Sequence, residues 1–283
     1  MSLVLTHHVY GKSRIRLTRV TRHADRHDLQ ELCVAVQLEG DFAASYLTGD
    51  NRDIVATDSM KNIVYVLAKK HGIGAIEGFA ETVARHFVQT YAQVRAATID
   101  LVEHSWQRMV VDGRDHPHAF VGGASDKRMA VVTLTRQGVR MESGLDGLSL
   151  LKTTDSAFSG FVRDEYTTLP ETSDRIFATL LSARWLWGKT PPDWDRANRA
   201  IRVAVVETFA RHRSLSVQQT LHAMGTAALE TCPEIEQITL TMPNKHHLLI
   251  NLQPFGLDNH NEVFVATDEP HGVISATLSR GPG

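Results

Sequence analysis

Three side chains in the second half of the sequence are of types that could together hold a flat, polar anion. Arg175 carries a planar guanidinium that can donate two parallel hydrogen bonds to one edge of such a ring, which a lysine cannot do. Phe158 offers an aromatic face for stacking, worth ~1 kcal/mol beyond area burial. Gln218 follows Ser216, a good helix N-cap, so its amide would lie in a first helical turn beside free backbone N–H groups, including that of Val217.

Each of these side chains also has a common structural interpretation. An arginine that follows an aspartate is most often part of a surface ion pair. A glutamine in a first helical turn usually caps the helix, and a Phe-x-x-Phe pair usually packs in the core. The three residue types therefore indicate a binding site only if a wider pattern joins them.

Fifteen histidines raise the question of a metal site. The doublets His7-His8 and His246-His247 are poor chelators, because adjacent side chains in a strand point to opposite faces. His116 and His118 could share one ion, yet no Cys or Glu partner lies nearby in the sequence. We therefore predict no metal site, and a zinc ion at these two histidines is the alternative.

The elements that must position these residues show in the hydrophobic periodicity of the first half. Apolar residues alternate strictly with other residues over Leu32–Leu38, the period-2 pattern of a half-buried strand. From Ile76 to Tyr91 they recur at three- and four-residue spacing, which predicts an amphipathic helix of about four turns. Further strands are predicted at Ile15–Leu17, Val102–Val111 and Met129–Thr135, with a loop over Asp112–Asp126.

The second half repeats this order of elements. A long helix is predicted with Trp194, Ile201 and Phe209 on one side, and a second helix begins after Ser216. Strands are predicted within Val139–Lys152 and near Ile176–Trp187, and again at Gln237–Met242, His247–Leu252 and Gly272–Leu278.

A short sequence echo supports an internal repeat. Val55–Ser59 and Lys152–Ser156 both end in Thr-Asp-Ser, and each stands after the first strands of its half. Together with the shared order of elements, this predicts two tandem copies of one α+β unit, over residues 1–137 and 138–283. Each copy would have an antiparallel sheet with helices packed on one face.

The composition excludes several classes of partner. Lys plus Arg is 30 against 32 for Asp plus Glu, a net charge of −2, so neither nucleic acid nor a charged membrane is expected. Only two cysteines occur, Cys33 and Cys232, each in an apolar pattern, which speaks against a disulfide framework. No apolar run approaches the ~20 residues of a membrane span, and the first ten residues are unlike a signal peptide. We expect a soluble, intracellular protein.

Four segments make the sequence resemble the urate oxidase family over nearly its whole length. They occur in order and at family-like separations: Tyr10-Gly11-Lys12, Val55–Asn62, Phe158–Arg175, and Ser216-Val217-Gln218 with Leu240–Leu252. The resemblance implies tandem tunnelling folds that assemble into a barrel. It also implies oxidation of urate by O₂ and water to 5-hydroxyisourate and H₂O₂, with no metal or organic cofactor. The assembly implied is a homotetramer, at minimum an antiparallel homodimer.

The resemblance implies roles for the site residues. Arg175 and Gln218 would clamp the purine while Phe158 stacks on it. Lys12 must be desolvated to present a neutral amine, and the Thr57 hydroxyl can accept a proton and pass one on. The catalytic residues implied are Lys12, Thr57 and His246. The substrate-binding residues implied are Thr57, Asp58, Phe158, Arg175, Val217, Gln218 and Asn244, with Asn244 and Thr57 lying against the O₂ site.

The two copies are not equivalent in these residues. Phe158, Arg175 and Gln218 follow Thr154 of the second copy, and the same offsets from Thr57 fall on Lys61, Gly78 and Val121. None of these three could stack on or clamp a purine. The first copy therefore carries the proton relay and the second carries the clamp. In the family the two halves meet across a subunit interface, so we expect each active site to be shared by two subunits.

Other interpretations remain open. Lys12 could be a solvated strand-end charge, and Thr57 or Asp58 could cap a helix that starts near Ser59. A pterin-acting or zinc-dependent tunnelling-fold enzyme of the cyclohydrolase or aldolase type is the main functional alternative, and an inactive purine-binding protein is another. The sequence ends without the peroxisomal Ser-Lys-Leu signal, which favours a cytoplasmic enzyme.

Overall fold

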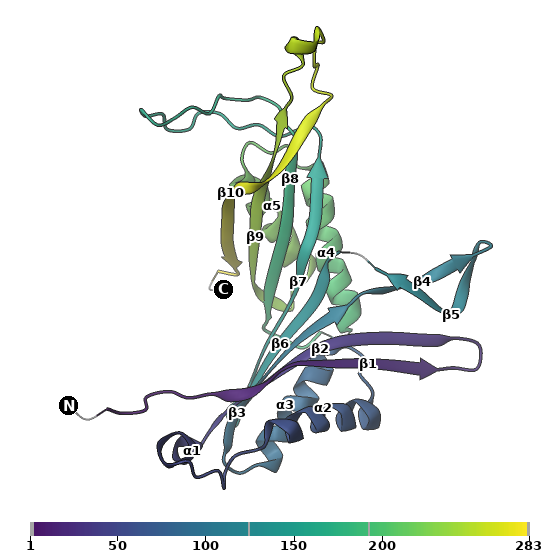
Figure 1. The fold of residues 1–283 in the computed structure, drawn as a ribbon, viewed down its shortest axis with the longest axis vertical. Helices are drawn as coiled ribbons and strands as arrows, with labels where there is room; N and C mark the ends of the chain where they lie inside the picture. Colours follow the sequence, from purple (N-terminus) through teal and green to yellow (C-terminus); the bar gives the residue numbers. More distant parts are fainter. Residues whose placement is uncertain (1–2, 124, 192, 282–283) are drawn as a thin grey trace. The chain divides into compact units, whose positions relative to one another are not determined.

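The chain forms two compact units that divide between Gly144 and Leu145. A computed structural model describes residues 3–123, 125–191 and 193–281. Figure 1 shows the elements of the first unit in purple to teal and those of the second in teal to yellow. Each unit combines an antiparallel sheet with helices, so the predicted α+β class is confirmed.

The sheet of the first unit has the order β1-β2-β3-β6, with antiparallel pairing throughout. Val36 of β2 lies opposite Lys12 on one side and Ile99 of β3 on the other. A separate two-stranded ribbon, β4-β5, lies between β3 and β6 in the sequence. The elements are β1 (Tyr10–Arg22), β2 (His27–Gly40), α1 (Ala43–Thr48), α2 (Thr57–His71), α3 (Ile76–Thr90), β3 (Val94–His104), β4 (Trp106–Val111), β5 (Arg114–Gly122) and β6 (Lys127–Thr135).

The core of this unit lies between the sheet and its helices. Helix α3 packs on β3 and β6, and α2 packs on β1. The predicted helical spacing is confirmed, since Ile76, Phe79, Val83 and Phe87 all point into the core with at most 2% of their surface exposed. The alternating residues of β2 are equally buried: Leu32, Val34, Val36 and Leu38.

The second unit repeats this plan with the sheet order β7-β8-β9-β10. Helix α5 packs on β9 and β10, and α4 packs on α5. The predicted N-cap is confirmed, because Ser216 accepts a hydrogen bond from the backbone of Gln219. The elements are β7 (Val139–Lys152), which crosses the boundary between the units, β8 (Phe177–Trp187), α4 (Trp194–Arg211), α5 (Val217–Thr231), β9 (Ile235–Leu249), the short 3-10 helix η1 (Gln253–Phe255) and β10 (Phe264–Ser279).

Three predictions about strands are wrong. The range expected to form one strand, Val102–Val111, contains the end of β3 and the whole of β4, which belong to different sheets. The expected loop Asp112–Asp126 contains β5, which pairs with β4 around Asp112 and Gly113, both at positive φ. An Asp-Gly pair in this conformation makes the tight turn that matches the twist of a hairpin. The strands expected at Gln237–Met242 and His247–Leu252 form one continuous strand, β9, because Pro243 stays paired with Val273 instead of breaking the ladder.

Candidate functional site

A cavity of about 640 Å³ lies within the second unit. Its wall includes Phe158 and Arg175, from the segment between β7 and β8, and Asn244 and His246 of β9. All four are half-buried. The structure therefore places the Phe158 ring and the Arg175 guanidinium on the same cavity as Asn244 and His246. The second pair follows the first by about 70 residues in the sequence.

The stacking ring and the guanidinium are in direct contact. The Arg175 guanidinium carbon lies over the Phe158 ring, 5.3 Å from its centroid. Phe161 stacks parallel to Phe158 with ring centroids 4.9 Å apart and an interplanar angle of 11°. Burial lowers the pKa of Arg175 below its ordinary range. The Phe-x-x-Phe pair thus forms a platform at the cavity wall, and a partly desolvated cation stands beside it.

Local hydrogen bonds hold the platform and the fork side by side. Phe158 and Thr172 exchange two backbone hydrogen bonds of 2.9 and 3.0 Å. Asp174 accepts a 2.8 Å hydrogen bond from the Thr154 hydroxyl and one of 3.3 Å from the backbone N–H of Ser156. The bond from Thr154 is the main reason why the pKa of Asp174 lies below its usual range. Asp174 therefore ties the chain that precedes Phe158 to the chain that ends in Arg175.

Asp174→Asn is expected to lower the melting temperature at pH 7 and to lower it less in acid. The pKa of Asp174 in the folded protein lies below its ordinary value of 3.8. Its stabilisation is therefore complete above that value and is lost as the pH falls through the lower, folded pKa. Calorimetric melting of both proteins from pH 7 to pH 2.5 measures the difference. A gap between the two melting temperatures that does not narrow as the pH falls would contradict the role given to the carboxylate.

The start of α5 lies beside the Phe158 segment. The Ala157 N–H donates to the carbonyl of Ser214 at 2.7 Å, and Ser156 forms a parallel bridge with Ser214. Gln219, and not Gln218, makes the side-chain hydrogen bond at the N-terminus of α5. Its amide oxygen accepts from the Leu215 N–H at 2.9 Å.

The expected residues of α5 differ from each other in exposure. Gln218 is exposed, while the Val217 side chain is buried, which leaves the backbone N–H of Val217 as its polar group. In the part of the chain that the structure describes, neither residue lines the cavity. The cavity wall itself continues along β9, where Asn244 pairs with Thr179 and Gly272, and His246 pairs with Thr267.

Lys12 and the expected residues of α2 belong to the first unit. Lys12 is half-buried on β1, opposite Val36. A side chain at Gly11 would place its Cβ 1.8 Å from the Val36 carbonyl oxygen, so only glycine fits before Lys12. The Tyr10 hydroxyl accepts from the Val55 N–H at 2.8 Å and donates to the Val55 carbonyl at 3.2 Å. Tyr10 therefore joins the Lys12 strand to the chain two residues before Thr57.

No role was predicted for Tyr10 from the sequence, although Tyr10 precedes Gly11 and Lys12 in the same motif. Burial is the main cause of its pKa lying above the ordinary value of 10.0. The phenol is therefore neutral at physiological pH and is able to donate and accept at the same time.

Asp58 does not cap its helix. Helix α2 begins at Thr57 with Ala56 as the N-cap, and no side chain caps it. Asp58 instead accepts from Lys61 at 2.5 Å and from Asn62 at 2.9 Å. The hydrogen bond from Lys61 is the main cause of a lowered Asp58 pKa, and the positive charge of Lys12 adds a smaller effect. The capping interpretation is therefore wrong, and the carboxylate lies within electrostatic reach of the Lys12 ammonium.

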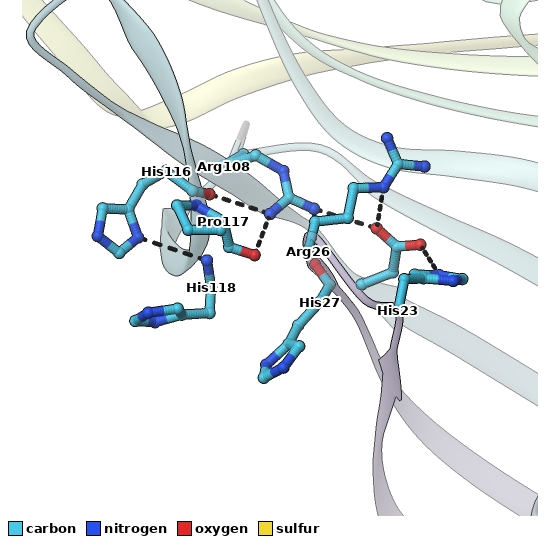
Figure 2. A network of polar contacts seen from close by, with 8 residues as sticks. His23, Arg26, His27, Arg108, His116, Pro117 and His118 are labelled. Atoms are coloured by element: carbon cyan, nitrogen blue, oxygen red, sulfur yellow. Dashed lines mark hydrogen bonds and ion pairs between the residues drawn. The ribbon is translucent and has the colours of Figure 1, made fainter.

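His116 and His118 belong to a polar network around Arg108 (Figure 2). The Arg108 guanidinium donates to the carbonyls of His116 and Pro117 at 3.0 and 2.8 Å, and to the carbonyl of His27 at 2.6 Å. It thereby attaches the β4-β5 ribbon to the start of β2. Among the described residues, no three His, Cys, Asp or Glu side chains are grouped as ligands of a metal ion. Within the same residues, no helix is long and apolar enough to cross a membrane.

Two α+β units in one chain, matched over 99% of that chain by the crystal structure of a hyper-thermostable uricase mutant with a TM-score of 0.95, define a tandem tunnelling-fold protein. The chain belongs to the uricase family, whose model matches residues 8–133 and 141–275.

Individual relatives agree with this assignment. The uricase of Arthrobacter globiformis is 44% identical over 278 residues, which cover 98% of this chain and 90% of that protein. The uricase of Aspergillus flavus is 38% identical over 289 residues, covering 96% and 95% of the two chains. The crystal structure of uricase from Arthrobacter globiformis matches with a TM-score of 0.94 at 42% identity, covering 100% of this chain and 97% of that chain.

Proposed function

We propose that this enzyme is a urate oxidase that converts urate, O₂ and water to 5-hydroxyisourate and H₂O₂ without a metal or an organic cofactor. The observation that carries the proposal is the contact between Phe158 and Arg175 on one cavity, together with membership of the uricase family. Urate near neutral pH is a flat monoanion with amide-like edges. A ring to stack on and a fixed pair of N–H donors suit such a molecule.

Binding uses groups of the second unit. Phe158 stacks on the purine, and the Arg175 fork and the Gln218 amide hold its edges. The Val217 N–H lies in the first turn of α5, where backbone donors are free of helical partners and favour an anion. Partial burial of Arg175 strengthens its interaction with the bound anion, because less water screens the charge.

Catalysis uses groups of both units. Neutral Lys12 takes a proton from urate through the Thr57 hydroxyl, and His246 completes the relay. Asn244 and Thr57 lie against O₂, and Asp58 belongs to the same end of the site. The resulting electron-rich urate dianion passes electrons to O₂ directly. The link from Tyr10 to Val55 supports the pairing of Lys12 with Thr57, because it fixes their two segments relative to each other.

The assembly follows from this division of roles. We propose that residues 1–137 and 138–283 are two tunnelling-fold units and that antiparallel pairs of chains complete each site. Two such pairs form a homotetramer, which is located in the cytoplasm. The edge strands β1 and β10 support this arrangement, because an unpaired edge is completed by another strand.

Oxygen consumption tests the proposal. Urate added to protein that has been treated with a chelator and desalted is expected to consume O₂ and release H₂O₂ in a 1:1 ratio, at the rate of untreated protein. An oxygen electrode and a peroxide assay measure the two quantities. Activity that disappears with the chelator and returns with zinc would instead favour the zinc-dependent alternative.

A further inference from the structure

Lys152, the last residue of β7, has no role in the site described so far. Its ammonium group lies 5.5 Å from the ring centroid of Phe209 and 6.0 Å from that of Phe177. Both rings are buried, with 3% and 1% of their surface exposed. Burial lowers the pKa of Lys152, and the negative charge of Asp155 opposes this effect. A cation withdrawn from water in this way requires compensating contacts, and two aromatic faces supply part of them.

The hydrogen bond of this ammonium group goes to the end of α4. Lys152 Nζ donates to the carbonyl of His212, the C-cap residue of α4, where a positive charge also complements the helix dipole. The His212 ring is hydrogen-bonded to Thr220 of α5 at 3.1 Å. Four residues after His212, Ser216 caps α5, which carries Gln218 in its first turn. Lys152 thus holds one end of the connection that leads to this part of the clamp.

The segment that carries Phe158 is attached to the same α4–α5 connection. This segment starts directly after Lys152, and it is attached to the α4–α5 connection by hydrogen bonds. The Ser214 N–H donates to the Asp155 carbonyl at 2.9 Å, and the Ala157 N–H donates to the Ser214 carbonyl at 2.7 Å. One residue after Ala157, Phe158 reaches the cavity.

The segment that carries Arg175 leads directly to Phe177, one of the two aromatic residues beside Lys152. Phe177 follows Arg175 by two residues and begins β8. Its ring packs on Phe209 of α4, with centroids 5.1 Å apart, and both rings face the Lys152 ammonium. The segments of Arg175, Phe158 and the α5 N-terminus therefore share contacts that meet near one half-buried charge.

We propose that Lys152 is the positioning residue of the purine clamp. It does not line the cavity, and it acts by holding in register the three segments that carry Phe158, Arg175 and Gln218. This inference rests on the proposed function for the identity of the ligand. Because the relay residues Lys12 and Thr57 belong to the first unit, loss of Lys152 weakens purine binding more than it slows the chemical step.

Lys152→Met tests this role, because it keeps the apolar stem between the rings and removes the charge and the donor. The KM for urate is expected to rise about tenfold, with kcat within about threefold of wild type. Lys152→Arg keeps a cation and a donor, and it is expected to keep KM within about threefold. Isothermal titration with xanthine, a purine that shares the pyrimidinedione ring of urate, should show the same loss of affinity for Lys152→Met.

The matched control is Lys189→Met, which removes an exposed lysine from the same unit. It is expected to leave KM, kcat and xanthine affinity unchanged. An unchanged KM in Lys152→Met, or a fall in kcat at constant KM, would overturn the inference.

A second variant covers the case in which Lys152→Met does not fold. In that case Phe209→Leu tests the inference, because it removes one of the two aromatic faces beside Lys152 and leaves the hydrogen bond from Lys152 to the His212 carbonyl. A raised KM supports the inference, and an unchanged KM refutes it. Failure of the proposed function is distinguishable, because wild-type protein would then not oxidise urate, and xanthine binding by the variants would still test Lys152.

Discussion

A mixture of two inactive variants, Thr57→Ala and Arg175→Ala, is expected to regain about a quarter of wild-type activity after the proteins are refolded together. Thr57 belongs to the first unit and Arg175 to the second. If the first unit of one chain and the second unit of another form each site, a mixed pair has one site with both residues intact. Random pairing produces mixed pairs about half of the time, and one of their two sites works, which gives about one quarter.

A second mixture, Arg175→Ala with Gln218→Ala, is the matched control for this experiment. Both residues belong to the second unit, so every site of a mixed pair lacks one clamp residue and activity should stay absent. Differently tagged chains and a pull-down show that hybrids form. If hybrids form and the Thr57→Ala and Arg175→Ala mixture remains inactive, both residues serve a site within one chain and the shared site is refuted.

Lys12→Met is expected to reduce kcat by roughly 10²-fold or more, which is the usual loss when a general base is removed. Methionine is unbranched and only one heavy atom shorter than lysine, so the half-buried position on β1 stays largely filled. Steady-state kinetics with urate measure the effect. Lys69→Met, which removes an exposed lysine of α2, is the control and should leave kcat unchanged.

The double variant of Lys12→Met and Thr57→Ala tests whether the two residues act as one relay. Each single change is expected to cause a similar loss of kcat, and the double change little more, because removing either member already breaks the relay. Losses that multiply in the double variant would mean that the two residues act independently. The Tyr10 link would then have only a structural role.

The elements of the fold that could be predicted from the sequence are those with strong periodicity or a clear cap. The helix expected from Ile76 ends at Thr90, and the helix expected after Ser216 begins at Val217. The strand β5 was missed because Gly and Pro residues in the range Asp112–Asp126 are typical of loops. In a hairpin the same residue types form the turn, and Pro117 is tolerated in a ribbon whose edges are open.

The site could be predicted only in part. The residue types of Phe158 and Arg175 indicated a stacking ring and a fork, and the structure places them in contact on one cavity. The roles given to Lys12, Thr57 and His246 remain predictions. Tyr10 and Lys152 were missed as positioning residues, because each acts through a hydrogen bond to a backbone atom 45 or 60 positions away. Such bonds leave no periodic pattern in a sequence.

The proposed pairing of chains would link activity to protein concentration. β1 lies at the edge of its sheet, so in that assembly another chain would complete the surroundings of Lys12. The number of working sites then follows the law of mass action, and specific activity falls when the enzyme is diluted below the dissociation constant of the pair. A measurement made at nanomolar enzyme would report the strength of the assembly as much as the rate of the chemistry. A covalent link between the chains would separate the two quantities.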